Sequence, residues 1–276
     1  MISVKVYEVG PRDGLQSLKH PVDTNTKKSL IEALYAAGID SIEETSFVHP
    51  KLVPNMADAE DVVTGRGSAL VLNKRGYERA IAAGVKKINI VLSPCETFNL
   101  KNMNATNTEI VLRYRTFMQN IPKENVRVYI SMAFGSPYSG ETSEAQIKNC
   151  IRDAKMFGDT VVFADTVGCA DRLQIMLWAD IAHNEGLKVA LHLHHKGDES
   201  VPLSMIRAAI FSGIIEFDTS IGGLGGCPFA EGSGANLSTE TLVRHLKVWG
   251  IECNVDEKKL QHALKITREI KLGGAE

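Results

Sequence analysis

Cysteine is scarce in this sequence and follows no pattern. The chain has 276 residues, of which five are cysteines. No two of them stand at the CxxC spacing; they are Cys95, Cys150, Cys169, Cys227 and Cys253. An odd, scattered set argues against a disulfide framework and against a zinc site made of cysteines. The set suits a reducing compartment, and we therefore expect a cytoplasmic protein.

Long apolar runs and a surplus of one charge are missing as well. No run in the sequence reaches the roughly 20 apolar residues that a membrane-spanning helix needs. The chain starts at Met1 directly with a strand-like stretch, without a basic and then apolar leader. The formal net charge is −2, so no global basic field would attract nucleic acid or an anionic membrane. We expect neither partner, and expect a small molecule as ligand.

What the sequence does have is an alternation of strand-like and helix-like segments. Hydrophobic residues make up 44% of the chain and charged residues 23%, a composition that supports a folded core. The predicted strands are 3–9, 41–46, 69–72, 85–91, 126–132, 160–164, 188–192 and 214–218. The predicted helices are 24–37, 75–83, 108–119, 144–157, 172–184, 201–212, 240–249 and 257–270.

This order of segments predicts the fold class. About eight βα units with short connections and no linker favour an α/β protein of the (β/α)₈ TIM-barrel type over an open doubly wound sheet. We therefore expect a single catalytic domain over residues 1–276, with the C-terminal helices packed on the barrel.

Two histidines stand where barrel enzymes carry their catalytic groups, at the carboxyl end of a strand. His192 and His194 are two residues apart, so their side chains share one face and can converge on one metal ion. Asp13, after the first predicted strand, offers a carboxylate from the opposite side of the barrel mouth. Nitrogen and oxygen donors together suit Mg²⁺, Mn²⁺, Fe²⁺ or Zn²⁺, and ligand type alone does not choose among these ions.

Arg12 and Glu43 each allow two interpretations. Arg12 either forms a local salt bridge with Asp13 or stabilises a developing enolate oxygen in a water-poor pocket. Glu43, in the second predicted strand, either holds Arg12 in place or acts as an acid or base, and we favour the supporting role. Glu44 is expected to point away, because side chains alternate along a strand.

The longest loop-like stretch, residues 220–238, follows the eighth predicted strand and is rich in glycine. It lacks the motifs of a P-loop and of a dinucleotide-binding turn, so we do not expect nucleotide binding. Loops of this length often cover active sites, and we expect a lid. Cys227, flanked by glycines on this loop, is a better acid, base or thiol candidate than the other cysteines. Cys95 and Cys169 lie near strand ends and are expected to be structural.

Ordered motifs along nearly the whole chain carry a family resemblance. They are Val9 to Gln16, Glu43 to Val48 with Pro50-Lys51 and Val53-Pro54, Pro137-Tyr138 with Gly140, Asp165-Thr166 with Gly168, His192 to His194, and Gly223 to Pro228 with Asn236-Leu237. By these motifs the sequence resembles the hydroxymethylglutaryl-CoA lyase family of the DRE-TIM metallolyase group. The resemblance implies a carbon–carbon lyase that cleaves hydroxymethylglutaryl-CoA to acetoacetate and acetyl-CoA in a retro-Claisen step.

The resemblance also implies a role for each matching residue. A divalent cation, Mg²⁺ or Mn²⁺ ahead of Zn²⁺, would be bound by Asp13, His192, His194 and Asn236. The catalytic residues would be Arg12 as the enolate stabiliser, Glu43 behind it, Asp13, His192 as a candidate base, and Cys227 in proton transfer. An acyl-CoA substrate would contact Gln16 and Lys19.

The chain departs from the family pattern after the second histidine, where His195 and Lys196 replace the usual acidic residue and its neighbour. This change bears on the acyl group rather than on the metal. Three other functions stay open. One is a lyase or aldolase for another 3-hydroxy acid or its CoA thioester. The second is an isopropylmalate synthase-type condensing enzyme, disfavoured because no C-terminal accessory region follows. The third is a non-catalytic barrel, disfavoured by the intact site residues. A homodimer is the assembly we would expect, since many barrels associate.

Overall fold

Eight parallel strands form the centre of the molecule. The computed structural model describes residues 2–225 and 234–273. The strands are β1 (Lys5–Glu8), β2 (Glu43–Ser46), β3 (Ser68–Leu70), β4 (Lys87–Leu92), β5 (Val126–Ser131), β8 (Thr160–Asp165), β9 (Lys188–His195) and β10 (Glu216–Thr219). They pair in the order β1-β10-β9-β8-β5-β4-β3-β2. A backbone hydrogen bond of 2.9 Å from Glu8 to Ser41 and a parallel bridge from Glu8 to Ile42 connect β1 to the start of β2.

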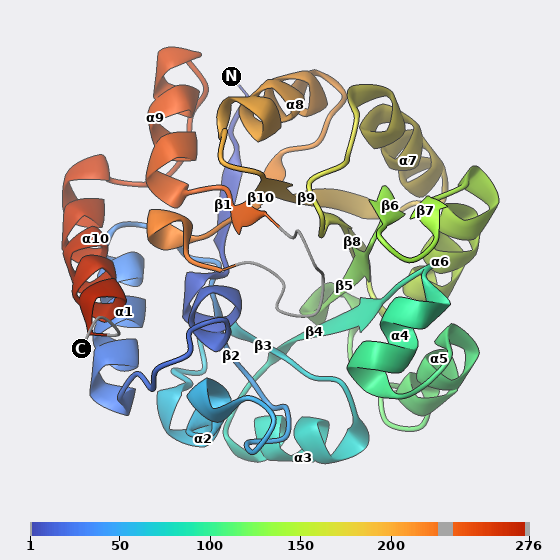
Figure 1. Ribbon diagram of the computed structural model, residues 1–276, viewed down its shortest axis with the longest axis horizontal. Helices are drawn as coiled ribbons and strands as arrows, with labels where there is room; N and C mark the ends of the chain where they lie inside the picture. The colour runs from blue at the N-terminus through green and yellow to red at the C-terminus, as the bar shows by residue number, and fades with distance from the viewer. Residues whose placement is uncertain (1, 226–233, 274–276) are drawn as a thin grey trace.

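Helices surround this barrel on the outside (Figure 1). They are α1 (Thr24–Ala36), α2 (Ala59–Val62), α3 (Lys74–Ala82), α4 (Glu96–Met103), α5 (Asn107–Arg115), α6 (Glu144–Phe157), α7 (Arg172–Asn184), α8 (Ser200–Phe211), α9 (Thr239–Val248) and α10 (Glu257–Leu272). The predicted (β/α)₈ TIM barrel is therefore confirmed.

Side-chain caps fix where several helices begin. The carboxylate of Asp23 accepts a hydrogen bond from the backbone of Thr26 at the start of α1. Reciprocal capping boxes start α5, between Thr106 and Glu109, and α6, between Ser143 and Gln146. Each box satisfies backbone N–H groups that have no partner inside the helix.

The strands place apolar side chains outward and polar ones inward. On β5, Val128 and Ile130 belong to the main apolar cluster that the helices cover. Arg127 and Tyr129 alternate with them along the strand and contact Asp218 of β10 across the barrel. Because side chains alternate along a strand, the same alternation builds both a dry outer layer and a polar interior.

The C-terminal helices pack on the barrel, as predicted. Helix α10 lies against α1, with Leu260 and Leu264 in one buried cluster with Leu30 and Leu34. Burying a leucine side chain contributes roughly 1.5–3 kcal/mol. This cluster therefore ties the end of the chain to its first helix.

Some elements differ from the prediction. Strand β9 runs to His195 rather than His192, because β11 (Ala235–Asn236) pairs with its end antiparallel. A short π-helix, η1 (Gly10–Gly14), follows β1, and a small hairpin of β6 (Gly135–Ser136) and β7 (Gly140–Glu141) follows β5. Helix α4 went unpredicted because its first residue is preceded by Cys95, whose side chain makes no capping bond.

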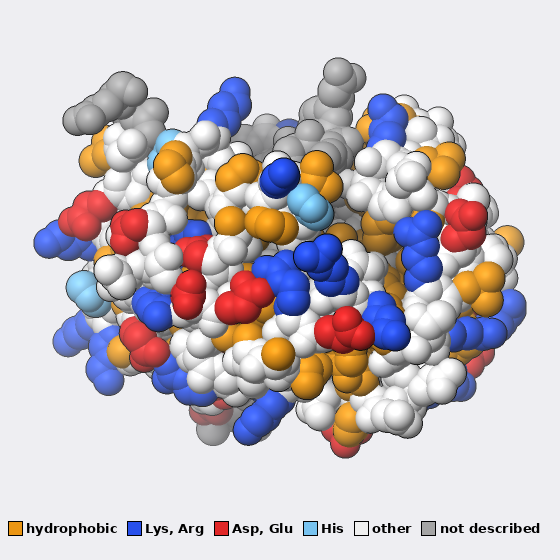
Figure 2. All heavy atoms as spheres, turned by 90° about the horizontal axis from the view of Figure 1, so that it is seen from below, with side chains coloured by type: hydrophobic (Ala, Val, Ile, Leu, Met, Phe, Trp, Pro, Cys, Tyr) orange, Lys and Arg blue, Asp and Glu red, His pale blue; other side chains and the backbone are white. Residues whose placement is uncertain are grey.

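The outer surface carries both charges. On the face seen in Figure 2, acidic and basic side chains are interspersed without a continuous patch of one sign. Within residues 2–225 and 234–273, no helix is both long and apolar enough to cross a membrane.

Candidate metal centre

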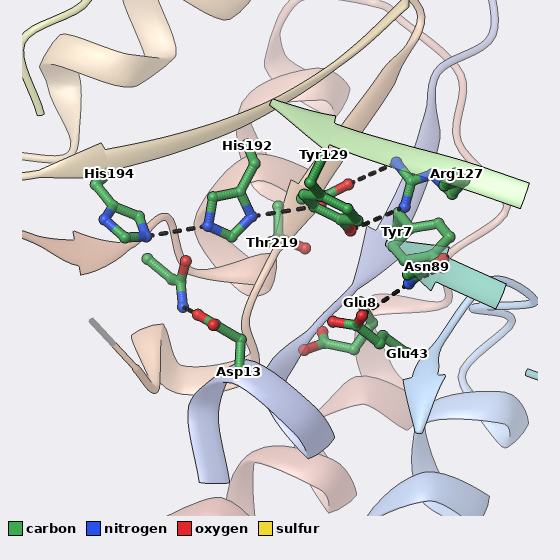
Figure 3. Close-up of polar contacts among 12 residues, drawn as sticks. Tyr7, Glu8, Asp13, Glu43, Asn89, Arg127, Tyr129, His192, His194 and Thr219 are labelled. Carbon is green, nitrogen blue, oxygen red and sulfur yellow. Dashed lines mark hydrogen bonds and ion pairs between the residues drawn. The ribbon is translucent and has the colours of Figure 1, made fainter. Parts of the chain in front are cut away.

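Three potential ligands meet at the carboxyl ends of β1 and β9. Asp13 comes from η1, and His192 and His194 from β9; one ligand atom of each lies within 4.8 Å of the other two. Both histidines are buried, and the Asp13 side chain is 14% exposed. Figure 3 shows the two imidazoles side by side, with Asp13 below them. The structure thus brings together the Asp and the HxH pair that the sequence predicted as ligands.

The hydrogen bonds of the two imidazoles determine which nitrogens face the centre. Nδ1 of His194 lies 3.0 Å from the carbonyl oxygen of Thr166, and Nδ1 of His192 lies 3.3 Å from Oδ2 of Asp218. Both partners are acceptors, so a proton on each Nδ1 satisfies them and leaves each Nε2 with a lone pair. The two Nε2 atoms lie 3.0 Å apart.

Asn236 is the fourth predicted ligand, and it lies at the same place. Its Nδ2 donates to Oδ2 of Asp13 at 2.8 Å and to the carbonyl oxygen of Leu224 at 2.9 Å. Pairing of β11 with β9 sets Asn236 opposite His194. Because its amide nitrogen is bound on the protein side, the amide oxygen is the atom left for a ligand.

This donor set fits a divalent cation. Metal–nitrogen distances of about 2.1 Å place two adjacent imidazole nitrogens about 3 Å apart, which is the separation of the two Nε2 atoms. Two imidazoles, a carboxylate and an amide oxygen leave coordination positions open for a substrate. Each imidazole also has an acceptor behind it, as metal-binding histidines usually do.

Arg12 lies beside this cluster, buried between two carboxylates. Its Nη1 donates to Oδ1 of Asp13 at 2.8 Å, and its Nε pairs closely with Glu43. Burial opposes the charge of Arg12, but Glu43 and Asp13 outweigh it and raise the pKa of the guanidinium. Burial likewise raises the pKa of Glu43, with Arg12 acting against it. Glu43 thus pairs with Arg12 in the structure, which is the contact that the supporting role expected from the sequence needs.

The charges around the ligands shift their pKa values apart. Burial raises the pKa of Asp13, but Arg12 and His192 outweigh burial and leave the pKa below its usual value. Burial and the neighbouring His192 lower the pKa of His194 to about 4. Burial also lowers the pKa of His192, yet Asp218 outweighs it and the pKa is raised overall. Asp13 as a carboxylate and His194 as a neutral imidazole match the protonation states that metal binding requires, and a metal would displace any proton on Nε2 of His192.

The structure brings the remaining predicted residues less close to the three ligands. Gln16 reaches Oδ1 of Asp13 with its Nε2 at 3.4 Å, whereas Lys19 is exposed on the segment that follows. Cys227 lies outside the described residues. Cys95 is buried, with its sulfur 3.2 Å from the hydroxyl of Ser136, and Cys169 is exposed.

Glu44 points away from the barrel interior, as predicted, but it is not solvated. It is 2% exposed and accepts hydrogen bonds from Tyr35, at 2.6 Å, and from the backbone of Thr64, at 2.8 Å. Its role is to tie β2 to α1 and to the segment before β3.

A buried polar network behind the ligands was not predicted. Arg127 and Tyr129 on β5 both bond to Asp218, and Asn89 on β4 donates to Glu43 at 2.8 Å. Figure 3 shows Arg127, Tyr129, Asn89 and Glu43 together with Tyr7 inside the barrel. The signal in the sequence was the alternation of polar and apolar residues in 126–131, which places Arg127 and Tyr129 on the same inward face.

A pocket of about 550 Å³ opens at the same end of the barrel. Its lining comes from the segments after β5, β8 and β9 and includes Phe134, Pro137, Val167 and Lys196. Lys196 is the only basic residue among the described residues that line it. A larger hollow of about 720 Å³ lies between α7, α8 and α9, on the outside of the barrel and away from the candidate ligands.

Comparison with known proteins gives relatives along nearly the whole chain. The model of the HMGL-like family matches residues 3–266. A hydroxymethylglutaryl-CoA lyase of Bacillus subtilis is 37% identical over 96% of this chain and 92% of its own length. The mitochondrial hydroxymethylglutaryl-CoA lyase of Arabidopsis thaliana is also 37% identical, over 93% of this chain, which spans 57% of that relative's length.

A solved structure agrees with these matches. The HMG-CoA lyase of Acinetobacter baumannii, in complex with coenzyme A and 3-methylmalate, superposes with a TM-score of 0.87 and 32% identity. The match covers 95% of this chain and 89% of that one.

Proposed function

The chain belongs to the HMGL-like family, and from this we propose that it is a carbon–carbon lyase that cleaves hydroxymethylglutaryl-CoA to acetoacetate and acetyl-CoA. The observation that carries the proposal is the meeting of Asp13, His192 and His194 beside the buried Arg12. Relatives named for this activity cover most of the chain, and the metal cluster with Arg12 beside it supports the proposal.

We propose that Asp13, His192, His194 and Asn236 hold the divalent cation. Oxygen donors from Asp13 and Asn236 next to two imidazoles favour Mg²⁺ or Mn²⁺ over Zn²⁺, because carboxylate and amide oxygens are the ligands that Mg²⁺ and Mn²⁺ prefer. When bound, the cation would orient the substrate and make its 3-hydroxyl group more acidic.

The reaction then needs a base and an electrostatic partner for the enolate. Loss of the 3-hydroxyl proton lets the electron pair form the ketone of acetoacetate while the C2–C3 bond breaks. The bonding pair of C2–C3 remains on the acetyl-CoA fragment as its enolate. His192 is the candidate base, although its Nε2 is also needed as a ligand, so that the two roles compete.

Arg12 is proposed to stabilise the enolate oxygen. Its charge is fixed, because Glu43 and Asp13 hold the guanidinium through Nε and Nη1. A buried donor that is already oriented needs no reorganisation when charge develops, and such donors contribute about 10²- to 10³-fold to turnover. Cys227 on the glycine-rich loop is proposed to return a proton to the enolate carbon, and Gln16 and Lys19 to contact the substrate.

A second candidate is a lyase for a different 3-hydroxy acid or its CoA thioester. Lys196 favours this second candidate, since its charged side chain lines the pocket beside the site. At this position the chain departs from the family pattern. An additional anionic group on the acyl chain would find a partner there.

The decisive experiment supplies hydroxymethylglutaryl-CoA to protein loaded in turn with Mg²⁺, Mn²⁺ and Zn²⁺ and follows acetoacetate and acetyl-CoA. We expect equal amounts of both products, loss of turnover on chelation, and recovery when metal is restored. Absence of product with all three ions would contradict the proposed substrate. Turnover of a related thioester under the same conditions would then favour the second candidate.

Three further features complete the proposal. The chain would act as one domain over residues 1–276. It would also form a homodimer, and light scattering in solution would test that assembly. The cytoplasm is the proposed location, although the Arabidopsis relative is named as mitochondrial.

A further inference from the structure

Asp218 stands behind His192 on the side away from the candidate metal. It lies on β10, next to β9 in the barrel, and its backbone pairs with that of His192. Its side chain is fully buried, and Oδ2 lies 3.3 Å from Nδ1 of His192. The carboxylate is therefore close enough to control the proton on that nitrogen.

Two other side chains hold the carboxylate in this place. Nη2 of Arg127 donates to Oδ1 at 2.9 Å, and the hydroxyl of Tyr129 donates to Oδ2 at 2.6 Å. The guanidinium of Arg127 is held in turn by Glu216 at 2.8 Å and stacks on the ring of Tyr7, 3.4 Å from its centroid. Hydrogen bonds from Arg127 and Tyr129 in the barrel interior thus hold both carboxylate oxygens of Asp218.

We propose that Asp218 is a positioning residue that keeps His192 in the Nδ1–H tautomer and aims its Nε2 lone pair at the metal. The inference rests on the proposed metal site, and it adds a residue that the ligand set does not include. With donors on both of its oxygens and a buried guanidinium beside it, Asp218 acts only as an acceptor. The neutral ring of His192 must then offer its N–H to Asp218 and its lone pair to the centre.

An amide at position 218 could not do the same. If its oxygen faced His192, its NH₂ group would face the guanidinium of Arg127, and two donors would meet. If its oxygen faced Arg127, its NH₂ group would point at His192 and favour the opposite tautomer, with a proton on Nε2. The first arrangement sets two donors against each other, and the second conflicts with a metal ligand at Nε2.

The test compares Asp218→Asn with Glu216→Gln. Both changes turn a β10 carboxylate that pairs with Arg127 into its isosteric amide, but only Asp218 contacts His192. Binding of Mn²⁺ is measured by calorimetry, without substrate, and the visible spectrum of the Co²⁺-loaded proteins reports the ligands. We expect Asp218→Asn to weaken Mn²⁺ binding about 10- to 100-fold and to alter the Co²⁺ spectrum, while Glu216→Gln keeps both. Equal Mn²⁺ affinity in the two variants would overturn the proposal.

A second measurement needs no variant, in case Asp218→Asn does not fold. In ¹⁵N-histidine NMR of the Mg²⁺-loaded wild-type protein, we expect the proton of His192 on Nδ1; a proton on Nε2 would overturn the proposal. Neither experiment uses hydroxymethylglutaryl-CoA. Failure of the wild-type protein to cleave that thioester would refute the proposed function and leave this inference standing.

Discussion

The amide of Asn236 donates a 2.8 Å hydrogen bond to the carboxylate of Asp13, across 223 residues of sequence. The same amide nitrogen donates to the carbonyl oxygen of Leu224 at 2.9 Å. The segment after β10 and the π-helix after β1 are thereby held as one unit. The two oxygen ligands that we propose for the metal depend on each other's position.

Gly225 is the residue that permits this approach. Its φ is +105°, and a Cβ there would lie 2.5 Å from Nδ2 of Asn236 and 3.2 Å from Oδ2 of Asp13. Gly225→Ala should therefore displace Asn236 and weaken Mn²⁺ binding by about tenfold or more. The matched control is Gly213→Ala, since Gly213 also has a positive φ, +86°, with nothing within 4 Å of the added carbon. Equal Mn²⁺ affinity in the two variants would show that Asn236 is not a ligand.

Removal of a ligand should abolish metal binding and turnover together. We expect this for Asp13→Ala, His192→Ala and His194→Ala, because each loses one of the donors that meet at the centre. Equilibrium dialysis with Mn²⁺ checks the binding. His245→Ala is the control, as its Nδ1 bonds within its own helix, to the carbonyl oxygen of Thr241. A variant that retains wild-type Mn²⁺ affinity would remove its residue from the ligand set.

Arg12→Met should separate chemistry from metal binding. The change removes the charge that we assign to the enolate but none of the four ligands. Turnover should fall by at least about 10²- to 10³-fold, with Mn²⁺ affinity nearly intact. Measuring kcat and Mn²⁺ affinity on the same preparation distinguishes a role of Arg12 in the chemistry from a role in metal binding. A collapse of Mn²⁺ affinity would mean that Arg12 mainly orients Asp13, to which it bonds at 2.8 Å.

Glu8 should make the protein less stable as the pH rises. Burial raises its pKa to about 8, although hydrogen bonds from Thr239, Ile221 and Gly10 act to lower it. A folded-state pKa above the unfolded value means that the folded state holds the proton. The stabilisation is full below the unfolded pKa and is lost as the pH rises towards about 8.

Glu8→Gln provides the comparison, because the amide is neutral at every pH and has nearly the same shape. Between about pH 5 and 8, the free energy of unfolding of the wild-type protein should fall relative to the variant by about 1.4 kcal/mol per pH unit. Urea denaturation at several pH values measures this slope. Parallel curves for the two proteins would mean that Glu8 is ionised in the fold, stabilised by its three donors.

The strand order and most helices could be predicted from local sequence patterns. Helical spacing acts within a few turns of chain and marks where helices lie. The boundary at the end of β9 could not be found in this way. His195 extends the strand only because Ala235, far along the chain, pairs with it.

In the candidate site, too, local sequence predicted some residues and long-range contacts decided others. The spacing of His192 and His194 predicts a shared face, because strand geometry fixes it locally. Arg127, Tyr129 and Asp218 were not recognised as a network, since their contacts join β5 to β10 across the barrel.

The sequence by itself determined the barrel, the residue types available for a metal and the family to which the chain belongs. Residue periodicity and ordered motifs are properties of the chain alone. Tertiary structure decided which atoms face the centre. The orientation of His192 depends on Asp218, and that of Asn236 on Asp13 and Leu224. These hydrogen bonds join segments far apart in the sequence that only the closed barrel brings together, and so no local pattern could specify them.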